Sequence, residues 1–196
     1  MERVIAKYRT FREAEAATRE YYQRLSPSEW LEILFQLRAM AHKESEATSG
    51  RLARIYRLLN SHGVEYVVVG AVALAHHGFP RYTGDLDILV RNSTENAKRL
   101  ESALAEFGFA SLGLKAADFK DSYRVIQLGV PPNRIDLLTS LTGVSFDEAW
   151  TGRVEVLLEE THVNFIGREA LIRNKRLTGR AQDKADLEAL GVSEER

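Results

Sequence analysis

The sequence contains no cysteine and no long apolar run. Without cysteine, disulfides, thiolate metal ligands and a cysteine nucleophile are all excluded. A membrane-spanning helix needs about 20 consecutive apolar residues, and no segment approaches that length. The start of the chain, MERVIAKYRT, also lacks the apolar core of a signal peptide. We therefore expect a cytoplasmic protein that makes no contact with a membrane.

The chain also has almost no net charge, because 27 basic side chains face 28 acidic ones and leave a formal charge of −1. This balance argues against general electrostatic adhesion to nucleic acid, so any such contact requires a local basic patch. With 44% hydrophobic and 28% charged residues, the composition is that of an ordinary soluble globular protein. A chain of 196 residues can hold one well-packed domain and a smaller appendage.

Two amphipathic stripes near the N-terminus predict a helical hairpin over residues 10–42. The second helix has clear start signals, because Ser26 can cap it, Pro27 occupies its first position and Glu29 completes a capping box. The polar stretch 42–50, HKESEATSG, breaks the apolar stripe. We therefore assign residues 1–48 to an N-terminal helical hairpin and residues 49–196 to the main domain.

The main domain alternates short strands with helices. Short apolar or β-branched runs predict strands at residues 66–69, 85–90, 123–128, 134–138, 154–158 and 162–166. Helical patterns fall between them, and the last one extends from residue 168 to about 190. The two prolines within residues 129–133 suit a connection between antiparallel strands. This order predicts a mixed α/β fold (α+β) with a partly antiparallel sheet flanked by helices.

Two acidic residues share one face of the predicted strand 85–90. Side chains alternate along a strand, so Asp85 and Asp87 point to the same side, while Leu86 and Ile88 point into a core. Two neighbouring carboxylates repel each other unless a proton or a cation neutralises them. Oxygen ligands alone favour Mg²⁺ or Mn²⁺. The alternative is a solvated pair of aspartates at the start of a strand.

A third aspartate strengthens the interpretation as a metal site. Asp136 lies in the predicted strand 134–138, between the apolar residues Ile135 and Leu137. Three carboxylates on neighbouring strands can hold two divalent ions about 3.5–4 Å apart, as in two-metal phosphoryl-transfer sites. We therefore predict Asp85, Asp87 and Asp136 as both the metal ligands and the catalytic residues.

A glycine turn precedes the aspartates. At Gly70 and Ala71 the chain passes from a strand to a helix, and backbone N–H groups at such a helix start can bind phosphate. A tight turn without any ligand would explain the same glycine.

Residues 70–87, GAVALAHHGFPRYTGDLD, resemble the signature of the DNA polymerase beta nucleotidyltransferase superfamily. The nearest branch comprises bacterial nucleotidyltransferases related to abortive-infection and toxin–antitoxin toxins. The resemblance implies a nucleotidyltransferase fold in which Gly70 cradles a nucleoside triphosphate and the three aspartates bind Mg²⁺. It also gives Arg81 and Thr83 a supporting role at the nucleotide, although ordinary loop chemistry would explain both residues equally well. Ala71 departs from the pattern, because many members carry a phosphate-binding serine there.

The C-terminal residues 169–187, EALIRNKRLTGRAQDKADL, are similar to the same branch. This similarity implies that Lys175 reaches the nucleotide phosphates, and we expect its side chain to be exposed. Lysine suits that role because it is a mobile point charge. Further basic residues would enlarge the positive field, namely Arg173, Arg176, Arg180 and Lys184. An ordinary solvated helix face would account equally well for the arginines.

Together these features predict a Mg²⁺- or Mn²⁺-dependent nucleotidyltransferase. An acceptor hydroxyl would attack the α-phosphate of a nucleoside triphosphate such as ATP, and pyrophosphate would leave. Two alternatives stay open, namely a nucleotide-binding module without turnover and a glycosyltransferase that binds a nucleotide sugar. The sequence does not distinguish RNA, protein and small-molecule acceptors, and it leaves base preference and homo-oligomer formation open.

We predict that the N-terminal hairpin docks on the main domain and restrains access of the acceptor. Two amphipathic helices of this size bury too little apolar surface to be stable alone. The short linker keeps the hairpin at a high effective concentration near the main domain. Truncation at Ser49 should therefore leave a folded protein with increased transfer activity. An unchanged rate on the same acceptors would contradict the regulatory hypothesis.

Overall fold

The computed structural model describes residues 5–10, 13, 14, 17, 54–79, 83–130, 134–158 and 160–192. Seven strands form one mixed sheet in the order β1-β4-β5-β3-β2-β7-β6. β3 runs parallel to β5 and β2 runs parallel to β7, whereas the other neighbours are antiparallel. The strands are β1 (Ile5–Tyr8), β2 (Tyr66–Val68), β3 (Asp85–Val90), β4 (Val125–Leu128), β5 (Arg134–Leu138), β6 (Val154–Leu158) and β7 (Thr161–Phe165).

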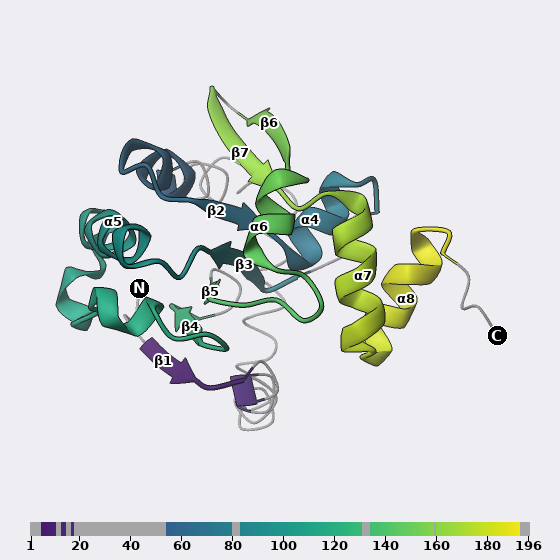
Figure 1. The fold of residues 1–196 in the computed structure, drawn as a ribbon, viewed down its shortest axis with the longest axis horizontal. Helices are drawn as coiled ribbons and strands as arrows, with labels where there is room; N and C mark the ends of the chain where they lie inside the picture. Colours follow the sequence, from purple (N-terminus) through teal and green to yellow (C-terminus); the bar gives the residue numbers. More distant parts are fainter. Residues whose placement is uncertain are drawn as a thin grey trace, which may run out of the picture.

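Helices cover both faces of this sheet. The helical residues 54–61 and α5 (Thr94–Leu104) lie on one side, and α4 (Gly70–His76), α7 (Arg168–Thr178) and α8 (Ala181–Ala189) lie on the other (Figure 1). A short helix, α6 (Phe146–Thr151), follows β5, and helical turns at Ala105–Phe109, Ala110–Leu112 and Ala116–Phe119 follow α5. Among the described residues, no helix has the length and apolar content needed to cross a bilayer.

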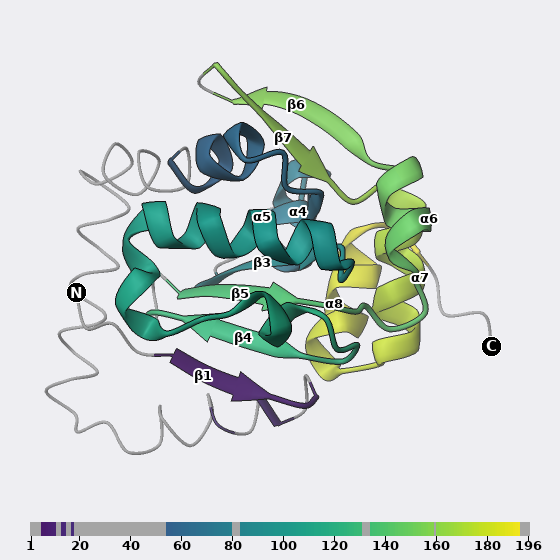
Figure 2. The same ribbon diagram turned by 60° about the vertical axis from the view of Figure 1, so that its left-hand side comes forward.

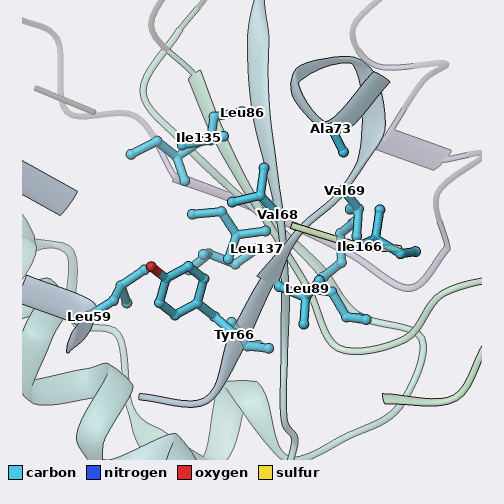
Figure 3. Close-up of a cluster of buried hydrophobic side chains, with 14 of the residues drawn as sticks. Leu59, Tyr66, Val68, Val69, Ala73, Leu86, Leu89, Ile135, Leu137 and Ile166 are labelled. Atoms are coloured by element: carbon cyan, nitrogen blue, oxygen red, sulfur yellow. The ribbon is translucent and has the colours of Figure 1, made fainter. Parts of the chain in front are cut away.

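The main core lies between the sheet and the side that carries α5. Leu86 lies beside Ile135 in the parallel register of β3 and β5, and Leu137 is the next apolar residue on the same face of β5 (Figure 3). Tyr66 of β2 stacks on Tyr56 at a ring distance of 6.2 Å. Because side chains alternate, burying this apolar set turns the intervening residues of β3 and β5 to the opposite face.

The predicted mixed α/β class is confirmed, with the strands 85–90, 134–138 and 154–158 at the expected residues. β4 and β5 are antiparallel, as the prolines between them suggested. The terminal stretch, expected as one helical segment, is divided into α7 and α8. Gly179 ends α7 in a left-handed conformation with φ of +64°, and its N–H donates to the Lys175 carbonyl at 3.0 Å. The chain turns there because glycine adopts this conformation at little cost.

The N-terminal segment contributes a strand that the sequence division did not anticipate. β1 pairs with β4, with Tyr8 opposite Val125, so residues assigned to the hairpin belong to the sheet of the main domain. Most of the predicted hairpin, residues 10–42, lies outside the described residues. Ala14 is described, and it is buried in the core.

The position of β1 supplies a control for the truncation at Ser49. A chain lacking residues 1–9 loses β1 but keeps the hairpin sequence, whereas the Ser49 truncation removes both. Comparing the transfer rates and melting temperatures of the two proteins separates the contribution of the hairpin from that of an edge strand. Equal rates in the two shortened chains would contradict a regulatory hairpin.

Candidate functional site

The structure brings the three predicted aspartates together on the face of the sheet opposite α5. Asp85 and Asp87 belong to β3, and Asp136 of β5 is the direct register partner of Asp87. Neighbouring residues in register on parallel strands point to the same face. The three carboxylates therefore occupy one side of two adjacent strands.

An arginine holds this group of carboxylates. The Arg134 guanidinium donates from Nε to Asp136 Oδ1 at 2.7 Å and from Nη2 to Asp136 Oδ2 at 3.1 Å. Nη2 also donates to Asp85 Oδ2. Arg134 is buried, and such charge-assisted, two-pronged contacts fix both partners in place. It therefore locks the relative positions of Asp85 and Asp136.

Arg134 was missed by the sequence analysis. The available signal was its position two residues before Asp136 in an otherwise apolar strand, which places both side chains on the same face. An arginine there supplies positive charge to neighbouring carboxylates, and spacing alone could have suggested it.

Two polar side chains donate hydrogen bonds to the carboxylates of Asp136 and Asp85. Gln127 of β4 donates to Asp136 Oδ2 at 3.1 Å, and the Thr83 hydroxyl donates to Asp85 Oδ1 at 2.5 Å. Thr83, predicted at the nucleotide, thus contacts an aspartate and orients it. Arg81, given a similar role, lies outside the described residues.

The local charge balance is negative, and the pKa values respond to it. Burial raises the pKa of Asp87 well above its usual range, and the negative charges of Asp85 and Asp136 raise it further. Burial likewise raises the pKa of Asp136 to about 6, although the charge of Arg134 opposes that rise. One guanidinium does not balance three carboxylates, so this face has unmet demand for a proton or a further cation.

The donor set suits a hard divalent cation, because it offers carboxylate oxygens and neither imidazole nor thiolate. Within the described ranges, however, no three His, Asp or Glu side chains are already arranged around one ion position. Arg134 donates to oxygens of both Asp85 and Asp136. A bound Mg²⁺ or Mn²⁺ would therefore share these oxygens with Arg134 or displace it from them.

Gly70 lies directly against Asp87. A Cβ atom at position 70 would come within 2.0 Å of Asp87 Oδ2, and Gly70 has a left-handed φ of +65°. Both observations require glycine at the start of α4. The neighbouring Ala71 is 4% exposed and brings no hydroxyl to the site.

Lys175 lies in an environment that differs from the expected one. Its side chain is 2% exposed, and Nζ donates to Asp186 Oδ2 at 2.6 Å and to Asp183 Oδ1 at 3.3 Å. The expectation of an exposed lysine is therefore wrong, because two buried carboxylates of α8 draw the ammonium between the helices. Its contact with nucleotide phosphates stays a prediction, and it would require a change of partners.

Arg180 connects this helix pair with the aspartates. Its Nε donates to Asp183 Oδ2 at 2.6 Å, and its positive charge acts to lower the pKa of Asp87. The positive field expected from the C-terminal segment thus extends to the aspartate site at this residue.

Comparison with solved structures finds several similar chains, and two of them are described as related to nucleotidyltransferases. An antigenic nucleotidyltransferase-like protein from Paracoccidioides brasiliensis has a TM-score of 0.49 and 14% identity, over 74% of each chain. A candidate nucleotidyltransferase from Thermotoga maritima has a TM-score of 0.44 and 15% identity, over 86% of this chain and 96% of its own. No protein-family model and no curated protein sequence matches the chain. A functional proposal therefore depends on the chemistry of the site itself.

Replacing Gly70 with alanine should disturb Asp87 specifically. Gly113 provides a matched control, because its φ of +66° is nearly the same and a Cβ there would meet nothing within 4 Å. Gly113→Ala should cost about 1–2 kcal/mol from backbone strain alone. Gly70→Ala should cost about 1–3 kcal/mol more, because the added methyl displaces the Asp87 carboxylate. Urea denaturation measures the difference, and equal losses would rule out the close contact.

Removing the Lys175 charge should lower stability. Lys175→Met removes the buried ammonium that Asp183 and Asp186 share, while Arg180 still contacts Asp183, and the loss should cost about 3–5 kcal/mol. Arg176→Met, at the next and exposed position of α7, should change stability by less than about 0.5 kcal/mol. Chemical denaturation at neutral pH tests this, and similar midpoints for the two variants would contradict a stabilising ion pair.

Proposed function

We propose that the chain is a Mg²⁺-dependent nucleotidyltransferase of the toxin-related branch. The observation that supports this most strongly is the convergence of Asp85, Asp87 and Asp136 on one face of two parallel strands. In the proposed reaction, an acceptor hydroxyl oxygen forms a bond to the α-phosphorus of a nucleoside triphosphate. The bond from that phosphorus to the bridging oxygen breaks, pyrophosphate leaves with its electron pair, and the hydroxyl proton passes to solvent or to a nearby base.

The three aspartates would hold the divalent cation. When bound, the cation supplies charge stabilisation for the transferring phosphoryl group and lowers the pKa of the attacking hydroxyl. Asp87 is the central ligand in this assignment, because it lies between Asp85 on its own strand and Asp136 on β5. The raised pKa of Asp87 fits a side chain that gains most from a neighbouring cation.

Other residues of the chain position these ligands. Arg134 and Gln127 fix the Asp136 carboxylate, and Thr83 orients Asp85. Gly70 leaves room for the main chain to approach Asp87, so a phosphate bound at the start of α4 would lie next to the metal ligands. Arg180 adds positive charge on the same side.

A nucleotide-binding module without turnover is the second candidate. It is favoured by the contacts of Arg134, which already neutralises Asp85 and Asp136 without a metal ion, and by Ala71, which lacks a phosphate-binding hydroxyl. The two candidates differ in one measurable product, because only the enzyme releases pyrophosphate.

Asp87→Asn should abolish transfer while leaving the protein folded. Asparagine is a neutral isostere, and burial already favours the neutral form of Asp87, so the melting temperature without metal should not fall. Transfer should fall by at least about a hundredfold, since a metal ligand outweighs a supporting contact.

The assay incubates the full chain with each α- or γ-labelled nucleoside triphosphate and cell lysate, with Mg²⁺ or with EDTA. Nuclease and protease digestion then classify the labelled product as RNA or protein. Asp147→Asn is the control, because Asp147 is an exposed aspartate of α6 that contacts Arg91. Wild-type turnover in Asp87→Asn would refute the metal assignment, and pyrophosphate release by neither protein would favour the binding module.

A further inference from the structure

A pocket of about 490 Å³ lies on the same face of the sheet as the aspartates, and the proposed function gives it no ligand. Its wall includes Val125 of β4 and Leu138 of β5, which are register partners. The next pair of register partners on the same face of these two strands is Gln127 and Asp136. Residues two apart on a strand are separated by about 7 Å, so the pocket begins one side-chain row from Asp136.

The pocket also carries positive charge, because Arg180 is one of its lining residues. Its lining residues include Leu138 at the end of β5 and Leu177 of α7, and Figure 2 shows that β5 ends near α7 and α8. A ligand in it could therefore extend toward the aspartates.

Tyr123 presents an aromatic ring at this pocket. The residue is 71% exposed, the most exposed large hydrophobic side chain among the described residues. Its backbone is left-handed, with φ of +63°, which is a genuine outlier for a bulky residue. The Tyr123 N–H donates to Ser140 Oγ at 3.1 Å, and this contact helps to hold the conformation. Backbone strain of this kind concentrates at ligand sites.

The opposite wall combines apolar surface with a directed polar group. Leu177 is 60% exposed and packs over Gly143, where a Cβ would meet its Cδ1 at 2.0 Å. The Asn174 side-chain amide donates to the Thr142 carbonyl at 3.0 Å. Both described hydrogen bonds of Asn174 use its Nδ2, so within the described part of the chain the Oδ1 oxygen keeps its capacity to accept.

We propose, on the basis of the proposed function, that this pocket binds a nucleobase. The Tyr123 ring stacks on the base, the leucine surface covers its edge, and Asn174 Oδ1 accepts a hydrogen bond from an exocyclic amino group. The volume lies within the usual range for small-ligand pockets. Bases with an amino group, such as adenine and cytosine, therefore bind better than uracil. The base belongs either to the nucleoside triphosphate or to the terminal nucleotide of an RNA acceptor.

The test measures binding without turnover. Asp87→Asn protein in EDTA is titrated with adenosine, cytidine and uridine, and binding is followed by NMR. Four further substitutions are added separately to this background, and Asn174→Leu is one of them. Tyr123→Asn removes the ring but keeps a residue that tolerates a left-handed backbone, and Tyr123→Phe keeps the ring. Leu157→Asn is the control, because Leu157 is 61% exposed on β6 at the opposite edge of the sheet.

Tyr123→Asn should raise the Kd for adenosine about tenfold or more, from the loss of base stacking. Tyr123→Phe and Leu157→Asn should stay within about twofold of the parent. Asn174→Leu should remove the preference for adenosine over uridine. Equal affinity in Tyr123→Asn and its parent, or an equal loss in Leu157→Asn, would overturn the proposal.

Two further ligands identify the source of the base. If the donor nucleotide occupies the pocket, Tyr123→Asn weakens binding of the nucleoside triphosphate and leaves binding of a short RNA unchanged. If the acceptor occupies it, the pattern reverses. A Tyr123-dependent nucleoside site in a protein that releases no pyrophosphate would support the pocket and contradict the enzyme. Transfer with Tyr123-independent binding of all these ligands would contradict the pocket alone.

Discussion

The need to balance three negative charges on one face of a sheet governs this structure. Asp85, Asp87 and Asp136 come together because the apolar residues between them must enter the core on the other side. Unpaired buried carboxylates are costly, so their neighbours have to supply positive charge or protons. Arg134 supplies positive charge by direct contact with Asp85 and Asp136, and burial, followed by the charges of its two neighbours, raises the pKa of Asp87. The proposed Mg²⁺ would add positive charge at this face.

A second group of buried charges lies on the C-terminal helices, and its charges pair with one another. Lys175 pairs with Asp183 and Asp186, which joins α7 to α8 across the break at Gly179. Arg180 then contacts Asp183 and also acts on Asp87. The C-terminal helices are thus tied to the aspartate face by charge as well as by packing.

Much of the fold could be predicted from the sequence, because the strands carry regular alternation and the helices carry clear caps. Asp85 and Asp87 were readable as a pair, since a strand leaves few uses for two carboxylates on one face. Contacts between distant segments were not readable in the same way. β1 is short, and its sequence has no pattern that predicts pairing with β4. Its place in the sheet is therefore known only from the tertiary structure.

Because such contacts cannot be predicted from the sequence, Lys175 was expected to be exposed and Arg134 was not predicted as a site residue. A charged residue on a helix looks exposed in a sequence, and only the packing of α7 against α8 shows that carboxylates bury it. Arg134 and Asp136 are two residues apart on one strand and so point to the same face. The sequence does not give the distance between their side chains. Likewise, Tyr123 lies in a loop whose left-handed backbone has no sequence signal, because that conformation is typical of glycine and asparagine.

The pairing of β1 with β4 has a consequence for the long segment that follows it. The chain is fastened to the sheet at residues 5–8, and it is fastened again where the helical residues 54–61 pack into the core. A single cut between these two anchors would leave β1 on one piece and the other strands on the second piece, and the pairing of β1 with β4 would hold the two pieces together. The nicked protein would then keep the mass and shape of the intact one in solution while showing two bands after denaturation.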